Sequence, residues 1–149
     1  MPGYYSAILD ALGFCVERAG GSDVFVQELC PDSYLVAFLA GDEQQAMRFE
    51  PQEIETLHNE AAKHPVRTRR PSRRRHLRAA GCYLDERGAS AILLQERLSV
   101  YTVEFAGHAR RREHVSDRER IHVMLDDRQL EQSERWMLGT ERIRSASGF

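Results

Sequence analysis

The sequence predicts an α+β fold made of two tandem α-β-β-(β)-α copies of one unit, with antiparallel hairpins in a sheet and helices packed mainly on one face. The first observation is an internal repeat, since LDALGFCVERAG near the start of the chain corresponds to LRAAGCYLDERG 68 positions later. The second is that each of these helix-like segments is followed by two strand-like segments, DVFVQEL and YLVAFLAG after the first, AILLQERL and YTVEFAG after the second. The third is length, because 149 residues suit one domain, whereas a lone unit of about 65 residues buries little surface. We therefore expect the copies to share one core about an internal pseudo-two-fold axis.

The first copy is expected to contain a helix, a hairpin, a weak third strand and a second helix. Leu9, Leu12 and Val16 recur at helical spacing, and Gly20 is well placed to end that helix in a left-handed conformation. Pro51 suits the first turn of a helix, because its missing N–H is not needed there. The expected elements are a helix at 5–19, strands at 23–29, 34–39 and 45–49, and a helix that begins at Pro51.

The second copy is expected to repeat this order. Ser72 is a candidate cap for a helix that ends at Gly88, and the segment Ser116 to Glu119 has the spacing of a capping box. The expected elements are this first helix, strands at 91–95, 100–105 and, more weakly, 108–115, and a helix from 116 that continues through Ile121, Met124 and Leu125.

A glycine occupies the same position in the first helix of each copy. These residues are Gly13 and Gly81. Because glycine has no side chain, the shared position predicts a close approach of each helix to the sheet.

Charge divides the chain more sharply than its net value of −2 suggests. Residues 1–62 carry eleven acidic and two basic side chains, whereas residues 63–78 carry eight basic side chains and no acid. The remaining residues are nearly neutral, with twelve acids and eleven arginines. We expect a first repeat, an arginine-rich linker, a second repeat and a tail within one compact body, at residues 1–64, 65–73, 74–144 and 145–149.

The basic segment, which we call the arginine strap, is a candidate contact for nucleic acid or another anion. Guanidinium groups pair well with phosphate, but no aromatic side chain stands among these arginines for base stacking. Three interpretations stay open: the strap neutralises the acidic first half, contacts a protein or anion, or binds nucleic acid. Its residues are Arg67, Arg69, Arg70, Arg73, Arg74, Arg75 and Arg78.

A polar pair recurs at the end of the first strand of each copy, as Gln27-Glu28 and Gln95-Glu96. If the copies pair about a two-fold axis, the two glutamates could face each other, and two nearby carboxylates can hold a hard cation such as Mg²⁺. A metal-dependent hydrolase using Glu28 and Glu96 is therefore one hypothesis. The alternative is that Gln27, Glu28, Gln95 and Glu96 only supply polar strand ends.

The second strand of the first copy is apolar on both faces. Tyr34, Val36 and Phe38 are expected in the core, but Leu35, Ala37 and Leu39 alternate with them and are apolar too. A strand of this kind is buried on both faces or lies under a partner. Leu35, Ala37 and Leu39 are thus the candidate interface.

Other classes of function find little support in the sequence. The six histidines are scattered, so we predict no metal site and no cofactor, and no apolar run approaches the ~20 residues that span a bilayer. The order helix, three strands, helix is similar to that of secretion-chaperone-like bacterial proteins, which bind partners. We expect a cytoplasmic, non-enzymatic binding or adaptor protein that contacts a protein partner or its own copy, with nucleic-acid binding through the strap as the alternative.

Overall fold

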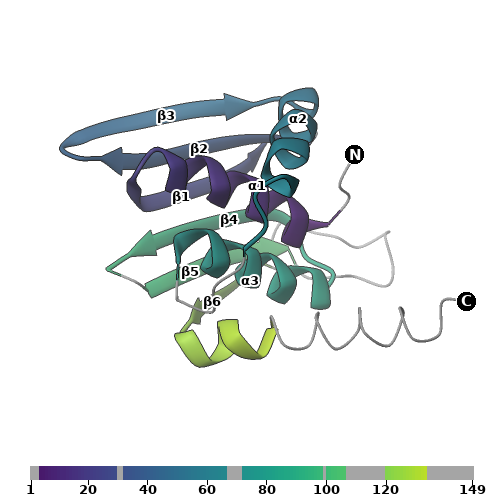
Figure 1. The fold of residues 1–149 in the computed structure, drawn as a ribbon. Helices are drawn as coiled ribbons and strands as arrows, with labels where there is room; N and C mark the ends of the chain where they lie inside the picture. Colours follow the sequence, from purple (N-terminus) through teal and green to yellow (C-terminus); the bar gives the residue numbers. More distant parts are fainter. Residues whose placement is uncertain (1–3, 30–31, 67–71, 99, 107–119, 134–149) are drawn as a thin grey trace, which may run out of the picture.

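A computed structural model of the chain contains a six-stranded antiparallel sheet with its helices on one face, which confirms the α+β class (Figure 1). The structure describes residues 4–29, 32–66, 72–98, 100–106 and 120–133. The strand order is β3-β2-β1-β4-β5-β6, so β1 and β4 are central. The elements are α1 (Tyr5–Arg18), β1 (Gly21–Leu29), β2 (Ser33–Ala40), β3 (Glu43–Phe49), α2 (Pro51–Ala62), α3 (Arg73–Glu86), β4 (Ser90–Arg97), β5 (Val100–Ala106) and β6 (Arg120–Leu125). Residues 127–133 are also helical.

The same order of elements occurs twice along the chain, first up to α2 and again from α3 onward. Helix α1, strands β1 to β3 and helix α2 are followed by α3, β4 to β6 and the helical segment 127–133. Helix α2 and the helical segment 127–133 also begin with the same kind of hydrogen bond. The Glu53 carboxylate accepts a hydrogen bond from the Glu50 backbone N–H at 3.2 Å, and the Gln129 side chain accepts one from Asp126 at 3.0 Å.

The prediction of a helix over Ile121, Met124 and Leu125 is wrong, because these residues belong to the edge strand β6. Residues 120–125 pair with residues 101–106 of β5, and the side of the strand that bears Val123 and Leu125 packs on the core. These residues form a strand rather than a helix because their pairing satisfies the backbone groups at the edge of β5, which would otherwise be unpaired. The capping box at 116–119 and the strand at 108–115 lie outside the described residues.

Both hairpins contain the same irregularity. Asp23 on β1 and Ala91 on β4 each have φ 50°, and the pairing with the following strand shifts register at each of them. Such a bulge adds one residue and increases the local twist. Gly20 and Gly88, three residues earlier in each case, have φ 69° and 61° and end α1 and α3, as predicted.

The two sets of strands meet where β1 pairs with β4. Val26 lies opposite Leu94, and one further residue pair is in register on each side of them. Beyond this short ladder a side chain replaces the backbone acceptor, because Glu28 Oε1 accepts a hydrogen bond from the Ile92 N–H at 3.1 Å. The sheet is therefore joined at its centre by a shorter ladder than those between its outer strands.

Helices α1 and α3 cover this central joint and pack closely on each other (Figure 1). A Cβ atom added to Gly13 would lie 2.7 Å from the Arg74 Cα, and one added to Gly81 would lie 2.5 Å from the Tyr5 carbonyl oxygen. The expectation of close approach to the sheet is wrong about the partner, since each glycine admits the first turn of the other helix. The two helices thereby place Leu9, Leu12, Leu77 and Leu84 in one buried core.

Candidate protein-contact face

All helices among the described residues cover one face of the sheet, and none of these helices lies on the second face (Figure 1). We call this second face the open face. Strand pairing arranges its side chains in rows that run across all six strands. The first row is Ala46, Ala37, Phe25, Gln95, Thr102 and Met124, and the second is Arg48, Leu35, Gln27, Leu93, Glu104 and His122.

The candidate interface residues Leu35, Ala37 and Leu39 lie together on the open face, in a groove of about 710 Å³. Phe25 and Ala46 from the neighbouring strands line the same groove. All three interface residues are half-buried, whereas the alternate residues of β2 are buried against the helices. The structure thus brings together an apolar patch on β1 to β3, while β5 contributes Thr102 and Glu104 to the same face.

Leu98 extends the groove at the turn between β4 and β5. Its side chain is 92% exposed and its φ is 49°. Neither observation favours leucine, because a large apolar side chain gains nothing in water and the left-handed region suits Gly or Asn. The sequence does not single out Leu98, since one exposed leucine has no periodicity and its backbone conformation is not visible in the sequence.

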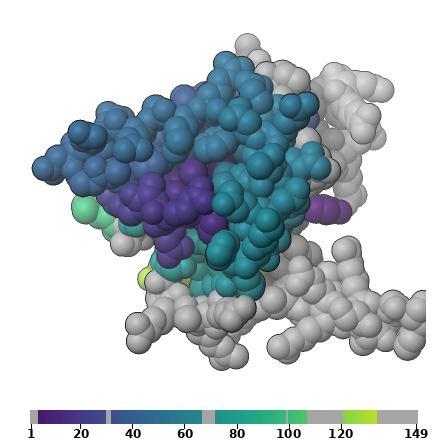
Figure 2. All heavy atoms as spheres, turned by 45° about the horizontal axis from the view of Figure 1, so that its top comes forward, coloured from purple at the N-terminus to yellow at the C-terminus, as the bar shows by residue number. Residues whose placement is uncertain are grey.

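Edge strand β3 borders the groove and is mostly exposed. Figure 2 shows it at the rim of the molecule, beyond α1. Its residues Gln44 and Ala46 line the groove. The apolar patch therefore reaches an accessible edge of the sheet rather than an enclosed cavity.

The polar pairs occupy two different faces. Gln27 and Gln95 lie in the rows of the open face, whereas Glu28 and Glu96 point to the helix side. Tyr5 donates to Glu28 at 2.6 Å, and Arg73 forms two hydrogen bonds with Glu96 at 2.6 and 2.8 Å. Glu28 lies level with Ile92 on the neighbouring strand β4. Glu96 follows Ile92 by four residues on that strand. At ~3.3 Å per residue, the two carboxylates are therefore roughly 13 Å apart.

That separation is too large for one metal ion, whose oxygen ligands lie within about 2.6 Å of it. Among the described ranges, no group of three His, Cys, Asp or Glu side chains is arranged to hold a metal ion. Within the same ranges, no helix is long and apolar enough to cross a bilayer.

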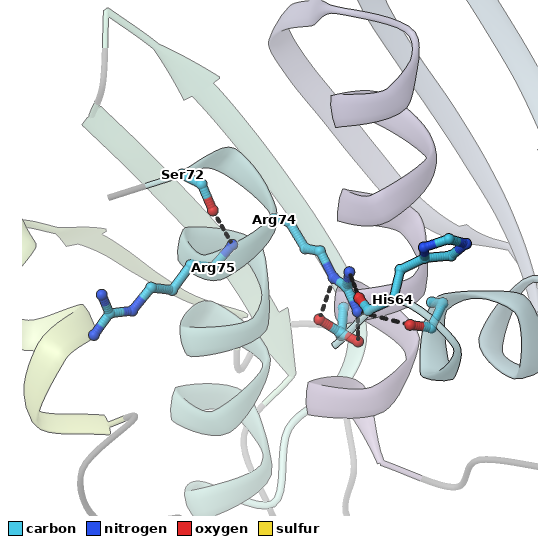
Figure 3. A network of polar contacts seen from close by, with 6 residues as sticks. His64, Ser72, Arg74 and Arg75 are labelled. Atoms are coloured by element: carbon cyan, nitrogen blue, oxygen red, sulfur yellow. Dashed lines mark hydrogen bonds and ion pairs between the residues drawn. The ribbon is translucent and has the colours of Figure 1, made fainter. Parts of the chain in front are cut away.

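Part of the arginine strap lies in helix α3, and the rest lies outside the residues that the structure describes. Arg73, Arg74, Arg75 and Arg78 belong to α3, so the helix begins one residue earlier than the predicted repeat boundary. Ser72 caps it as predicted, accepting a hydrogen bond from the Arg75 N–H at 3.2 Å (Figure 3). Arg67, Arg69 and Arg70 lie outside the described residues.

Arg74 is buried and fully engaged inside the protein (Figure 3). Its guanidinium donates to both carboxylate oxygens of Asp10, at 2.9 and 3.1 Å, and to the carbonyl oxygens of Ala61 and His64. These carbonyls lie at the C-terminal end of α2, where cations are favoured. A contact of Arg74 with nucleic acid would require breaking this network.

Arg73 lies beside a second cavity of about 490 Å³ near the start of α3. There the Tyr101 hydroxyl lies 3.3 Å from His76 Nδ1. Burial, followed by the charge of Glu96, raises the pKa of Tyr101, and the hydrogen bond to Glu96 raises the pKa of Arg73. The cluster is an internally paired set of charges, with Glu96 held by Arg73.

Comparison of the chain with protein-family models, with curated proteins and with solved structures finds no match in any of the three. The function is therefore inferred from the geometry described above.

Proposed function

We propose that this chain is a non-enzymatic protein that binds another polypeptide through the open face of its sheet. The observation that carries the proposal is the groove that Leu35, Ala37 and Leu39 share with Phe25 and Leu98. An exposed apolar groove rimmed by polar residues is typical of protein contact sites. Covering it would gain about 25 cal/mol for each Å² of apolar surface removed from water.

We further propose that the two halves are copies of one unit, related by a pseudo-two-fold axis between Val26 and Leu94. Supporting it are the equal order of elements, the bulges at Asp23 and Ala91, and the opposition of Val26 to Leu94, its own equivalent in the aligned repeat. The first residue of each leading helix also contacts the equivalent glutamate, since Tyr5 binds Glu28 and Arg73 binds Glu96.

The proposed symmetry sharpens the argument for the groove. Leu35 and Ala37 correspond to Thr102 and Glu104 in the aligned repeat, and all four lie on the open face. The fold is thus compatible with polar residues at these places. The apolar character of Leu35 and Ala37 is therefore better explained by a contact than by a need of the sheet.

Two substitutions test the proposal. Leu35→Arg puts a charge into the groove, whereas Gln45→Arg puts the same charge on the exposed strand β3, where the side chain points away from the open face. The purified chain and both variants are immobilised and exposed to a cell lysate, and the captured proteins are quantified by mass spectrometry. We expect Leu35→Arg to lose proteins that the wild type and Gln45→Arg retain.

A second pair of variants separates contact from folding. Leu98→Asn removes the exposed apolar side chain and suits the positive φ, so stability should hold or rise by about 0.5–1 kcal/mol while capture falls. Asp32→Asn is the control, because Asp32 has φ 59° in the other hairpin turn and does not line the groove. Equal capture by the wild type, Leu35→Arg and Leu98→Asn would contradict the proposed function.

A further inference from the structure

We infer that the polypeptide on the open face is a second copy of this chain, packed face to face about a two-fold axis. The inference rests on the proposed function and names its partner. Two sheets pack about 10 Å apart with their strands aligned within about 30°. The open face of a six-stranded sheet is the surface needed for such a sandwich, and the helices already cover the other side (Figure 1).

The residue rows indicate where the axis lies. In a symmetric dimer, a residue on the axis faces its own copy, so a charged residue there would meet the same charge. The first row, from Ala46 through Phe25 to Met124, contains no charged residue. The next row contains Arg48 and Glu104. An axis along the first row therefore avoids self-repulsion, whereas an axis along the second does not.

On β2 this axis also matches apolar groups. Rotation about this axis places the row on one side of the axis in one copy over the row on the other side in the partner. Leu35 of one copy therefore meets Leu39 of its partner. Both leucines line the groove, on opposite sides of Ala37 along β2. Arg48 would meet Gln44, an uncharged residue on the same strand. An axis parallel to the strands would instead lay Leu35 over the polar half of the sheet, near Glu104.

The size of the face is sufficient for a dimer. Six strands spaced ~4.8 Å apart, with about seven residues each at ~3.3 Å per residue, present roughly 600 Å² of projected area. Two such faces cover about 1,200 Å², which reaches the range of specific interfaces before side-chain relief is counted. Met124, 63% exposed at the far end of the central row, adds apolar surface there.

Sedimentation velocity over about 1 to 200 µM tests the inference, because association depends on concentration by mass action. We expect a monomer–dimer equilibrium for the wild type. Ala46→Arg, on the central row, should weaken it by about tenfold or more, since each Arg would face its own copy. Gln45→Arg is the matched control: Gln45 is the preceding residue on β3, also exposed, and points to the opposite face.

Mixing two variants tests the position of the axis. Ala46→Arg and Ala46→Glu should each dimerise weakly alone, but their equimolar mixture should regain at least wild-type association, because Arg then faces Glu. Disruption without recovery in the mixture would overturn the proposed axis. A wild type that stays monomeric throughout would overturn the dimer, and the lysate comparison of Leu35→Arg with Gln45→Arg would then show separately whether the face binds a different protein.

Discussion

Gly13 on α1 lies against the backbone of Arg74 on α3, leaving no room for a methyl group at the crossing of the two helices. The reciprocal contact joins Gly81 to Tyr5 and Ser6 at the start of α1. Both contacts join α1 to α3, and these two helices cover the central joint of the sheet (Figure 1). The helix pair therefore holds together the elements up to α2 and those from α3 onward.

Replacement of either glycine by alanine should destabilise the protein. In an exposed helix position this change stabilises by about 1 kcal/mol, because alanine has the higher helix propensity. At Gly13 the new Cβ would lie 2.7 Å from a backbone atom, so we expect a loss of about 1–3 kcal/mol from overpacking. Urea unfolding of Gly13→Ala and Gly81→Ala checks this, and a gain in stability for either would show that the crossing is looser than described.

The Asp10–Arg74 pair should be among the most sensitive in the chain. Their side chains are only 17% and 8% exposed, so Asp10→Asn leaves a buried guanidinium without its carboxylate, at a cost of about 3–5 kcal/mol. Arg18–Glu60 is the surface control, with side chains 54% and 47% exposed. Glu60→Gln should change the free energy of unfolding by less than about 1 kcal/mol. Thermal or urea unfolding compares the two, and similar losses would contradict the assigned burial.

Glu28 and Glu96 should respond differently to the same substitution. Glu28 accepts hydrogen bonds from neutral donors, Tyr5 and the Ile92 N–H, and a glutamine carbonyl can still accept them. Glu96 is buried and neutralises the half-buried Arg73, so Glu96→Gln removes the counter-ion of that guanidinium. We expect Glu96→Gln to cost about 1–3 kcal/mol more than Glu28→Gln in urea unfolding. The reverse order would contradict the interpretation of Glu96 as a structural counter-ion.

Stability should fall in alkaline solution. Burial raises the pKa of Tyr5, Tyr34 and Tyr101 above the ordinary value near 10, and the charge of Glu28 or Glu96 raises it further. Above about pH 10 the unfolded chain ionises these phenols while the folded protein keeps them protonated, so the unfolded state binds fewer protons and stability decreases as pH rises. Tyrosinate absorbance, followed together with circular dichroism, should show these three titrating only as the protein unfolds. Ionisation with the fold intact would contradict this.

Local patterns predicted most of the secondary structure, because hairpins, turns and caps depend on neighbouring residues. Ser72 and Gly20 act at the predicted helix ends. The prediction of a helix over residues 121–125 was wrong because it also depended on local spacing. Residues 120–125 form a strand by pairing with β5, and no local pattern reveals that pairing. Helix α3 begins at Arg73, the last residue of the expected arginine-rich linker, because arginine itself favours helices.

The candidate site was predictable in part. Two-sided apolarity of β2 pointed to Leu35, Ala37 and Leu39, and these residues do line the groove. Leu98 could not be found, because its importance lies in a backbone angle and an exposure. The partners of Arg73 and Arg74 could not be found either. Glu96 and Asp10 are 23 and 64 positions away, and the sequence offered many other acids.

The short ladder between β1 and β4 has a consequence for how the sheet opens. Only Phe25, Val26 and Gln27 pair across it, so backbone hydrogen bonds contribute little resistance to a parting of the sheet at its centre. Resistance comes from α1 and α3, whose shared core must be exposed in full before the strands can separate. Opening there would be a single, all-or-none event. The residues up to α2 and those from α3 onward should therefore gain and lose hydrogen-exchange protection together, as one cooperative unit.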